Sequence, residues 1–450
     1  MEVQNKPIFA RLDSVACSEA AKGLVSSVCT EAARWEADHQ RLKKRRSAKD
    51  AISFNKAIEK LLADIFRGHQ QGTSVYRSLK REAFNDAGVG YRSFRAAVEA
   101  LIGIGLVSHT PGAPRYRIHF EDFREKLPGK ASEFTATAEL LRRADAHGVS
   151  VDIGKHFIPE LPRHPLKLNA RSSRVGGDKV RGKPMSISPD DQAAQLLEKQ
   201  VRDINEFLAG FTIQGANHHG FNRIFGCGDD DDFRWNKGGR LYAAAGDEDN
   251  YQHMPATREG DRPGRDEITI DDEPVVEIDI RSCNLTIFYA LLGEPLDLTN
   301  DPFSNLGIDR SLAKAWTNAC FGAGRLLERW PPKLSADYED EYGHRPKLTA
   351  RAVGAKVLER LPHLKRLNDP DAPQWFDLQF RESETMIRTI TALMRLGIPA
   401  LPVHDSLLVP QRHLETASAC LADSFEKVVG VRPVITVKGR KGLKNPNEDE

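Results

Sequence analysis

The chain has 450 residues, in which 65 Lys and Arg balance 64 Asp and Glu to a net charge of +1. This length is too great for one ordinary domain and predicts two or three. The charge balance excludes an overall field that would attract nucleic acid or an anionic membrane, so any polyanion site must come from local clusters of charge.

The cysteine spacing and the hydropathy of the chain indicate in which cellular compartment the protein is expected. The cysteines are scattered without CxxC pairs, which disfavours both a zinc site and a disulfide framework. The first residues lack the basic and apolar regions of a signal peptide, and no run approaches the roughly 18 apolar residues of a membrane span. We therefore expect a cytoplasmic protein with no membrane partner, and we leave its oligomeric state open.

Residues 1–52 predict a helical extension that ends in the basic run RLKKRR at 41–46. Such a run is typical of a solvated helix face or a joint, and it is also compatible with phosphate contact. We assign it no function.

Residues 53–130 predict three short helices and a β-hairpin. Apolar residues recur at helical spacing in FNKAIEKLLADIFRGH and in the segment that starts at Tyr91, with SVYRSLKREAFNDAG and its Gly88 stop between them. The segment LVSHTPGAPRYRI then offers two strand-like runs around a Pro-Gly turn.

This order of elements resembles a winged helix-turn-helix. The resemblance implies DNA contact through the third helix and the hairpin. The candidate contacts are Arg92, Ser93, Arg95, Arg115 and Arg117. A small helical domain that binds protein is the alternative.

Residues 131–187 predict a connecting segment, whose part RHPLKLNARSSRVGGDKVRGKP is poor in large apolar residues and indicates a basic linker. Residues 188–441 predict one larger α/β unit that opens with a helix, for which Ser188 can serve as the cap and Pro189 suits the first turn. The run Asp229 to Asp232 favours a solvated loop over a metal site, because four adjacent carboxylates do not easily converge on one ion. Residues 442–450 form an acidic tail, expected to be disordered.

Two acids in the larger unit stand at the ends of apolar runs. Asp279 closes the strand in PVVEIDIRSCNLTIFYALLG, and Asp405 lies on a two-residue corner in ALPVHDSLLVP, where turn chemistry alone would favour Asn-Gly or Asp-Gly. Two such carboxylates held side by side repel each other, and a divalent cation between them relieves the repulsion. Two-metal phosphoryl transfer uses this arrangement.

A third segment, DRSLAKAWTNACFGAG, lies between the two acids. Arg310 and Lys314 are one helical turn apart, so both cations project from one face and can grip a triphosphate. Phe321 closes the segment with a ring that can stack on a base. Alone, this spacing is more typical of a solvated helix face.

Taken in order, these three segments resemble motifs A, B and C of the family A nucleic-acid polymerases, and the upstream GGRLYAAAGDEDNYQHMP resembles the primer-template segment of that family. The resemblance covers residues 188–441. It implies an α+β fold: a right-hand polymerase-type palm with an antiparallel sheet and reduced helical fingers and thumb, joined here to the mainly helical, winged-helix-like N-terminal domain.

The resemblance also implies roles for individual residues. Asp279 and Asp405, helped by the carbonyl of Ile280, would bind two Mg²⁺ or Mn²⁺ ions. Arg310 and Lys314 would hold the incoming triphosphate, with Lys314 also a candidate proton donor to pyrophosphate. The primer-template contacts would be Arg240, Asn250, Gln252 and His404.

Three departures from the family pattern concern the sugar and the base. Asn284 stands where the DNA polymerases usually have the Glu that helps to exclude the ribose 2′-OH. The corner reads His-Asp-Ser, like the single-subunit RNA polymerases, where DNA polymerases more often have His-Asp-Glu. The third segment is one residue short before Phe321, which stands where Tyr is usual.

We therefore expect a template-directed DNA polymerase that adds nucleotides to a primer 3′-OH and has no proofreading exonuclease, since no Asp-x-Glu strand motif precedes the unit. Its partners would be a DNA primer-template and nucleoside triphosphates, with dNTPs favoured. The alternatives are a primase-like or single-subunit RNA polymerase that uses NTPs, and a non-catalytic replication initiator that only binds DNA.

Overall fold

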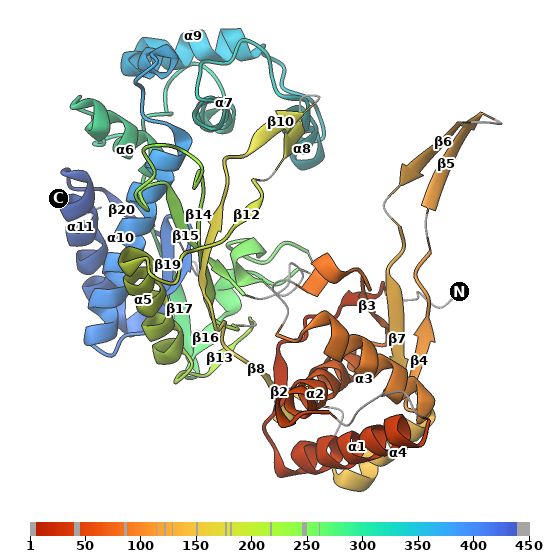
Figure 1. Cartoon of the computed structure of the whole chain (residues 1–450). Helices are drawn as coiled ribbons and strands as arrows, with labels where there is room; N and C mark the ends of the chain where they lie inside the picture. The colour runs from red at the N-terminus through yellow and green to blue at the C-terminus, as the bar shows by residue number, and fades with distance from the viewer. Residues whose placement is uncertain are drawn as a thin grey trace. The chain divides into compact units, whose positions relative to one another are not determined.

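A computed structural model of the protein describes residues 6–438 apart from 40–45, 85–87, 114, 121–122, 128, 150–151, 176–177, 181, 217, 245–249 and 261. The acidic tail expected at 442–450, and all of the basic run except Arg46, lie outside the described residues. The chain divides into two compact units, Met1–Glu160 and Leu161–Glu450, and each is described by itself (Figure 1). No helix within the described ranges is both long enough and apolar enough to cross a membrane.

The first unit combines four α-helices with short strands in the part of the chain that the structure describes. Its helices are α1 (Glu19–Asp38), α2 (Ala48–Gln70), η1 (Arg81–Phe84), α3 (Tyr91–Gly103), α4 (Ala138–His147) and η2 (Ile153–Lys155). Its strands are β1 (Ile8–Phe9), β2 (Ser14–Ala16), β3 (Val75–Arg77), β4 (Val107–Thr110), β5 (Arg115–Phe120), β6 (Phe123–Leu127), β7 (Ser132–Ala136) and β8 (Phe157–Pro159). The main sheet has the order β1-β3-β7-β4, and its last three strands are antiparallel.

Residues 1–52 do not form a separate extension. Leu24 and Val28 of α1 are buried in one hydrophobic core with Phe54 of α2 and Phe94 of α3, and the same core reaches Phe157 near the end of the unit. The reason is the apolar stripe of α1, which has to be covered by neighbouring helices. The N-terminal helix and the region expected at 53–130 are therefore parts of one folded unit.

Two local predictions for this unit are wrong. The segment expected as the second helix forms strand β3 and the short 3₁₀ helix η1, because Val75 is buried where β3 pairs with β7. The expected hairpin partners, β4 and β5, are both strands but do not pair with each other. Instead β4 pairs with β7, and the β5–β6 ribbon continues outward from that pair (Figure 1).

The second unit contains the two candidate acids. Its helices are α5 (Gln192–Leu208), η4 (Tyr251–His253), η5 (Arg265–Glu267), α6 (Cys283–Leu292), α7 (Arg310–Ala323), α8 (Pro332–Tyr342), α9 (Ala350–Arg360), η6 (Pro362–Asn368), α10 (Trp375–Arg395), η7 (Gln411–His413) and α11 (Leu414–Val429). Its strands are β9 (Leu166–Asn169), β10 (Ser173–Val175), β11 (Asp178–Val180), β12 (Pro184–Met185), β13 (Ile213–Gln214), β14 (Phe221–Phe225), β15 (Gly238–Ala243), β16 (Thr269–Ile270), β17 (Glu273–Ile280), β18 (Leu401–Val403), β19 (Ser406–Pro410) and β20 (Ile435–Lys438).

The central sheet of this unit is antiparallel throughout. Its strands follow the order β13-β16-β17-β19-β18, and β20 also pairs with β17. A second sheet, β12-β9-β14-β15, is mixed, because β9 runs parallel to β14. Helices and several small sheets within one unit agree with the expected α+β class at this coarse level.

The segment expected as a basic linker carries strands β9, β10, β11 and β12 instead. Leu166 and Leu168 of β9 are buried next to Phe225 of the parallel strand β14, and this burial draws the segment into the second unit. The following helix is capped by Asp191, which accepts a 3.0 Å hydrogen bond from the N–H of Ala194, and not by Ser188 as expected.

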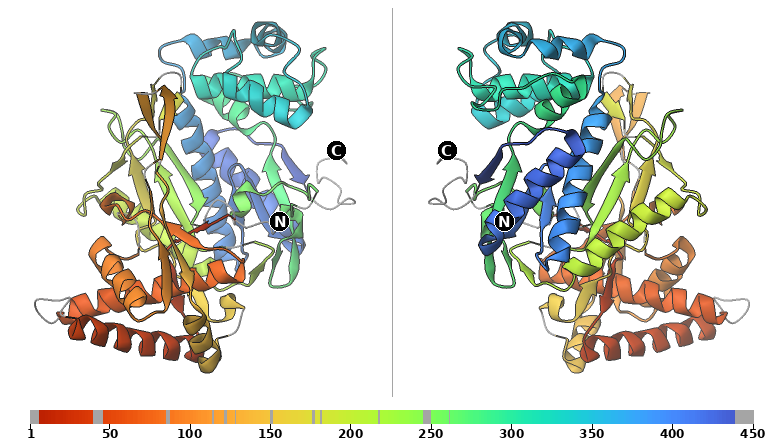
Figure 2. Two further views of the ribbon diagram at one scale, coloured as in Figure 1. Left: turned by 90° about the vertical axis from the view of Figure 1, so that its right-hand side faces the viewer. Right: turned by 90° about the vertical axis from the view of Figure 1, so that its left-hand side faces the viewer.

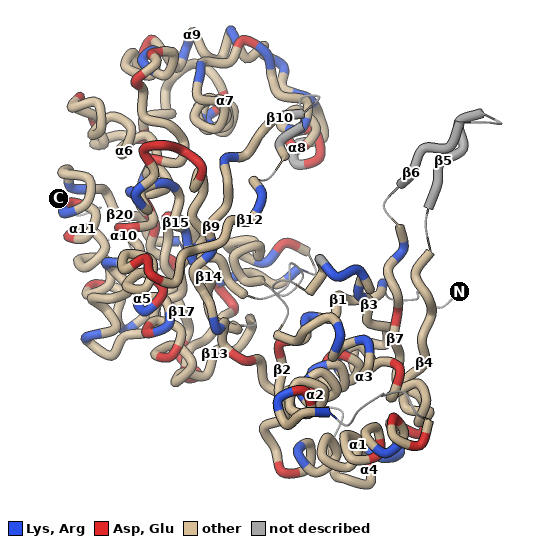
Figure 3. The backbone as a smooth tube through the Cα atoms, in the orientation of Figure 1, with Lys and Arg blue, Asp and Glu red and all other residues tan. Residues whose placement is uncertain are grey.

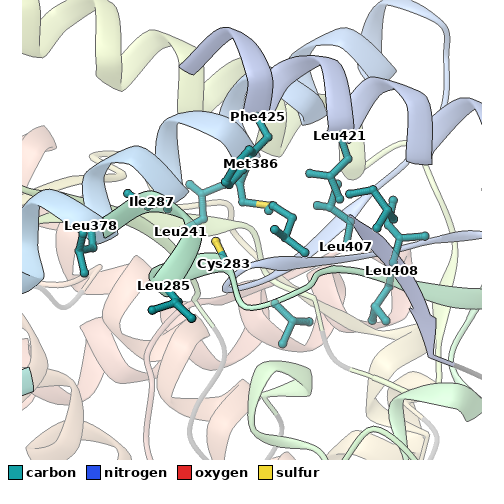
Figure 4. Close-up of a cluster of buried hydrophobic side chains, with 14 of the residues drawn as sticks. Leu241, Cys283, Leu285, Ile287, Leu378, Met386, Leu407, Leu408, Leu421 and Phe425 are labelled. Atoms are coloured by element: carbon teal, nitrogen blue, oxygen red, sulfur yellow. The ribbon is translucent and has the colours of Figure 1, made fainter. Parts of the chain in front are cut away.

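Helices α10 and α11 pack side by side against the strands of the second unit, as both views in Figure 2 show. Their apolar faces meet the sheet and helix α6 in a large hydrophobic core. Figure 4 shows part of it: Leu241 of β15, Cys283 of α6, Leu407 of β19, and Leu421 and Phe425 of α11. This core fixes the positions from which the polar side chains of the next section project.

Lys and Arg are interspersed with Asp and Glu in the described parts of both units (Figure 3). In the acidic loop at 229–232, such opposite charges form ion pairs. Asp230 and Asp232 lie 2.8 Å and 2.6 Å from the ammonium of Lys237, and Asp230 also pairs with Arg171. These ion pairs tie the loop to its neighbours, so its carboxylates do not form a separate ion-binding cluster.

Candidate functional site

Strand pairing brings Asp279 and Asp405 together. In the β17–β19 ladder Asp279 lies opposite Ser406, the residue that follows Asp405. The N–H of Ile280 donates a 3.4 Å hydrogen bond to the carbonyl of Asp405, which joins the end of β17 to the corner. Val403 pairs with Ser406, so His404 and Asp405 alone form the turn between β18 and β19. Two acids that are 126 residues apart in the sequence therefore share one end of the sheet.

The two carboxyl groups are poorly hydrated and repel each other. Burial and the neighbouring Asp405 carboxylate raise the pKa of Asp279 above the ordinary range. Burial and the Glu382 carboxylate raise the pKa of Asp405. Holding both acids ionised at this place costs free energy, and a bound cation lowers that cost.

Three ion pairs that sequence reasoning missed surround the acids. The ammonium of Lys438 on β20 lies 2.5 Å from Oδ2 of Asp279. Arg265 binds Glu277 on β17 at 2.9 Å. The third pair joins Arg240 of β15 to Glu382 of α10.

The only sequence signal for these pairs was indirect. Glu277 is a buried carboxylate between Val276 and Ile278 of β17, and Glu382 falls on the apolar face of α10, where a carboxylate needs a partner. Arg240, the partner of Glu382, lies 142 residues away and could not be paired with it from the sequence alone, and nothing local singled out Arg265, 12 residues before Glu277, as the partner of that glutamate. Ser406, the residue that makes the corner read His-Asp-Ser, is buried and donates a 2.9 Å hydrogen bond to Glu277.

His404 occupies a strained position on the corner. Its φ of 56° lies in the left-handed region, which costs free energy for a residue with a Cβ. Burial lowers the pKa of His404 to about 4, so the ring is neutral at physiological pH. Its Nδ1 is buried and has no hydrogen-bond partner among the described residues, and its ring lies edge-on to Tyr242 at a centroid distance of 6.3 Å. The tight corner therefore holds a neutral imidazole beside Asp405.

Two of the residues expected on the primer-template serve the fold instead. Gln252 is 7 % exposed, and its side chain binds Ala243 N–H and the carbonyls of Leu241 and Pro402. Asn250 is equally buried and accepts a 2.9 Å hydrogen bond from the N–H of Gln252. Every hydrogen-bonding group of the Gln252 amide is occupied inside the protein, so this prediction of a groove contact is wrong.

Arg240 is also turned inward. Its side chain is 13 % exposed, and its Nε and Nη2 bind the two carboxylate oxygens of Glu382 at 2.7 Å and 2.5 Å. Its guanidinium also stacks over the ring of Trp375, 5.5 Å from the centroid. This bidentate, desolvated pair fixes Arg240 beneath the corner, so its expected place on the primer-template would require the pair to open.

Helix α7 presents the two cations expected to hold a triphosphate. Lys314 is exposed and has no ion pair in the described parts of the chain. Arg310, one turn earlier, binds Asp301 at 2.5 Å. Phe321 is 1 % exposed and packs on Phe288 at 5.3 Å, so the expectation that its ring stacks on a base is wrong. The apolar face of α7 turns that ring into the core.

Asn284 lies in the first turn of α6, five residues after Asp279. Its Oδ1 is buried and accepts no hydrogen bond from any described residue. An unsatisfied buried amide oxygen costs free energy, and such atoms occur where a ligand supplies the donor.

The DNA contacts expected in the first unit fall on two elements. Arg92, Ser93 and Arg95 lie in the first turns of α3, where both arginines are exposed and Arg95 pairs with Glu99 at 3.6 Å. Arg115 and Arg117 lie on β5 of the ribbon.

The acid pair fits a magnesium or manganese ion by the chemistry of its donors. Carboxylate and carbonyl oxygens are the hard ligands that such ions prefer, and magnesium is commonly held by only one or two carboxylates together with water and substrate phosphates. The described residues contain no group of three or more His, Cys, Asp or Glu side chains arranged around one point. Asp279 and Asp405, with the carbonyl of Ile280, are the residues that would hold the ion.

In comparisons with known proteins, no family model matches the chain, and no curated protein matches it.

Proposed function

We propose that the second unit is a template-directed nucleotidyltransferase of the family A polymerase type, which extends the 3′-OH of a DNA primer and releases pyrophosphate. One observation carries the proposal. Asp279 and Asp405 share one end of an antiparallel sheet, with Asp405 on a two-residue corner whose other residue, His404, has a strained backbone. Two mutually repelling carboxylates placed in this way are a costly feature that the fold itself does not need.

Three further side chains of the second unit suit the parts of such a reaction. Lys314, exposed and without an ion pair among the described residues, would bind the triphosphate and supply a proton to the departing pyrophosphate. Arg310 would exchange Asp301 for a phosphate oxygen, since its own side chain is 56 % exposed. His404, neutral because burial lowers its pKa, would lie beside the primer terminus without adding charge.

Bound magnesium would activate the attacking oxygen and stabilise the charge that develops on the phosphoryl group. Asp279 and Asp405 would hold it, with the Arg265–Glu277 and Arg240–Glu382 pairs beside them.

The choice of sugar is a second question at the same site. Asn284 stands where DNA polymerases carry a Glu, and its unsatisfied amide oxygen can accept a hydrogen bond that a ribose 2′-OH donates. This feature favours the alternative of an RNA polymerase or a primase-like enzyme. We nevertheless favour DNA synthesis, because the segment from Gly238 to Pro255 resembles that of the DNA enzymes.

Extension of a labelled primer-template with Mg²⁺ tests the proposal. We expect the full chain to add dNTPs to the primer, and to add NTPs more slowly. Faster addition of NTPs would assign the enzyme to RNA synthesis. If the protein binds DNA but extends the primer with neither dNTPs nor NTPs, the result would favour the alternative of a non-catalytic replication initiator.

We propose further that the first unit is a winged helix-turn-helix that binds duplex DNA. The order of its elements supports this: β3, η1, α3 and β4 are followed by the β5–β6 ribbon and then β7, and β7 pairs antiparallel with both β3 and β4. The β4–β7 pair, extended by the β5–β6 ribbon, is in the position of a wing. The exposed cations Arg92 and Arg95 begin the helix that would enter the major groove.

Replacing both arginines by alanine should weaken duplex binding by about tenfold at moderate salt and make the affinity less dependent on salt, since two phosphate or base contacts are lost. Arg34→Ala is a matched control, because Arg34 is an exposed arginine on α1 of the same unit. Fluorescence anisotropy with a labelled duplex at several salt concentrations measures both effects. Unchanged binding in the double variant would favour a module that binds protein.

A further inference from the structure

Lys438 on the last described strand approaches the acid pair from the side opposite β19. Strand β20 pairs with β17 so that Lys438 lies opposite Glu277. Its ammonium is 2.5 Å from Oδ2 of Asp279 and 3.7 Å from Oε1 of Glu277. The Lys438 side chain is 47 % exposed, whereas that of Asp279 is 16 % exposed. A flexible, half-exposed side chain thus delivers a positive charge to a poorly hydrated carboxylate.

The charges around this contact do not balance. Seven side chains interact within the described part of the site: Asp279, Asp405, Glu277, Glu382, Arg240, Arg265 and Lys438. Four carboxylates and three cations leave one negative charge in excess. Arg240 and Arg265 are 13 % and 11 % exposed and each holds its own glutamate, whereas Lys438 is the cation with access to water. Replacing Lys438 by a divalent ion would make the group neutral.

We propose that Lys438 is a built-in counterion of Asp279 that a divalent cation displaces when it binds the acid pair. The inference rests on the proposed function and names a residue of the same site that controls its metal affinity. Without metal, Lys438 stabilises the folded chain by neutralising Asp279. With metal, the ammonium leaves Oδ2 and turns outward, which its exposure and its flexible four-carbon stem allow.

The exchange follows from geometry and charge. An ammonium 2.5 Å from Oδ2 occupies the place where a metal would bind that oxygen, so the two cations exclude each other. Any free energy that the Lys438 pair contributes has to be given up when metal binds, because coupling between two ligands of one site is reciprocal. Lys438 therefore lowers the metal affinity of the acids.

Titration of the full chain with Mn²⁺, followed by the electron paramagnetic resonance signal of the free ion and without nucleotide, tests the exchange. Lys438→Met keeps an unbranched side chain only one heavy atom shorter and removes the charge, and we expect it to bind Mn²⁺ about tenfold more tightly than the parent. Lys438→Arg keeps the charge and should remain close to the parent. Lys333→Met is the matched control, because Lys333 forms a 2.8 Å pair with Asp337 on the exposed helix α8.

Thermal unfolding gives a second measurement. In a chelator, Lys438→Met should unfold at a lower temperature than the parent, because Asp279 has lost its counterion, and Mn²⁺ should raise its unfolding temperature more than that of the parent. Equal Mn²⁺ affinities for the parent and Lys438→Met, or weaker binding by the variant, would overturn the exchange.

Asp405→Asn separates this failure from that of the proposed function. Loss of Mn²⁺ binding in Asp405→Asn shows that the titration reports the acid pair, and a negative result with Lys438→Met then overturns the exchange alone. If the parent does not bind Mn²⁺, or if Asp405→Asn binds it as tightly as the parent does, the metal site of the proposed function is overturned. The inference about Lys438 then fails with it.

Discussion

Asp405→Asn is expected to abolish primer extension and at the same time to stabilise the folded protein. The carboxylate is partly buried, is repelled by Asp279 and Glu382, and has no ion pair of its own among the described residues. An amide of the same shape removes that repulsion, for which we expect a gain of about 1–3 kcal/mol in the free energy of unfolding. Extension should fall about a thousandfold or more, because the amide is a poor magnesium ligand.

The gain in stability should depend on pH. Burial and Glu382 raise the pKa of Asp405, so the folded state keeps a proton that the unfolded state has already released. The stability from this group is fully present below the ordinary pKa of an Asp and is lost as the pH rises through the raised value. Urea unfolding at about pH 4 and about pH 8 should thus show a small difference between variant and parent in acid and a large one in base.

An Asp405→Asn protein that is inactive and also less stable at neutral pH would contradict this reading. Such a result would mean that the carboxylate supports the corner, as an ordinary turn residue does. Asp371→Asn is a control for a general effect of removing an acidic charge, because Asp371 is an exposed loop residue of the same unit.

The pairing of the two acids could be anticipated from the sequence because each stands at the end of an apolar strand. A strand of Val and Ile that ends in Asp, and a two-residue corner between apolar runs, fix the local direction of both chains. Antiparallel pairing then places Asp279 opposite Ser406. Here local pattern and tertiary structure agree.

The partners of buried charges could not be anticipated in the same way. Arg240 and Gln252 lie in a segment that looks polar, and nothing local shows that Glu382 or Pro402 covers them. Phe321 likewise carries no local sign that separates a core ring from one that stacks on a base, and only the packing of α7 on α6 decides it. Contacts across 140 residues or more depend on the whole fold, as the separation of Arg240 and Glu382 by 142 residues illustrates.

In the first unit, local propensity misled the prediction. The segment from Ser74 to Gly88 contains good helix formers, but its Val75 and Tyr76 become an interior strand between β1 and β7. Strand formation there is a tertiary effect, since it needs β7, about 57 residues further on. The same long-range pairing makes the wing-like element longer than the expected hairpin.

Arg240→Leu is expected to destabilise the second unit more than Glu382→Leu does, although the two changes break the same ion pair. Removing one partner of a desolvated pair typically costs about 3–5 kcal/mol, because the other charge stays in place without compensation. Glu382 left alone would face Asp279 and Asp405, which repel it. Arg240 left alone would still be attracted by Asp405. The free energy of unfolding should therefore fall further in Arg240→Leu than in Glu382→Leu.

The double variant Arg240→Leu/Glu382→Leu should be more stable than Arg240→Leu alone, because it leaves no unpaired charge from the pair. Urea unfolding of the parent, both single variants and the double variant forms a double-mutant cycle, for which we expect a coupling energy of at least about 2 kcal/mol. Arg310→Leu with Asp301→Leu is the matched pair with greater exposure, and its coupling should be below about 1 kcal/mol. Additive costs at Arg240 and Glu382 would show that the two side chains act independently, and Arg240 would then again be a candidate for contact with the primer-template.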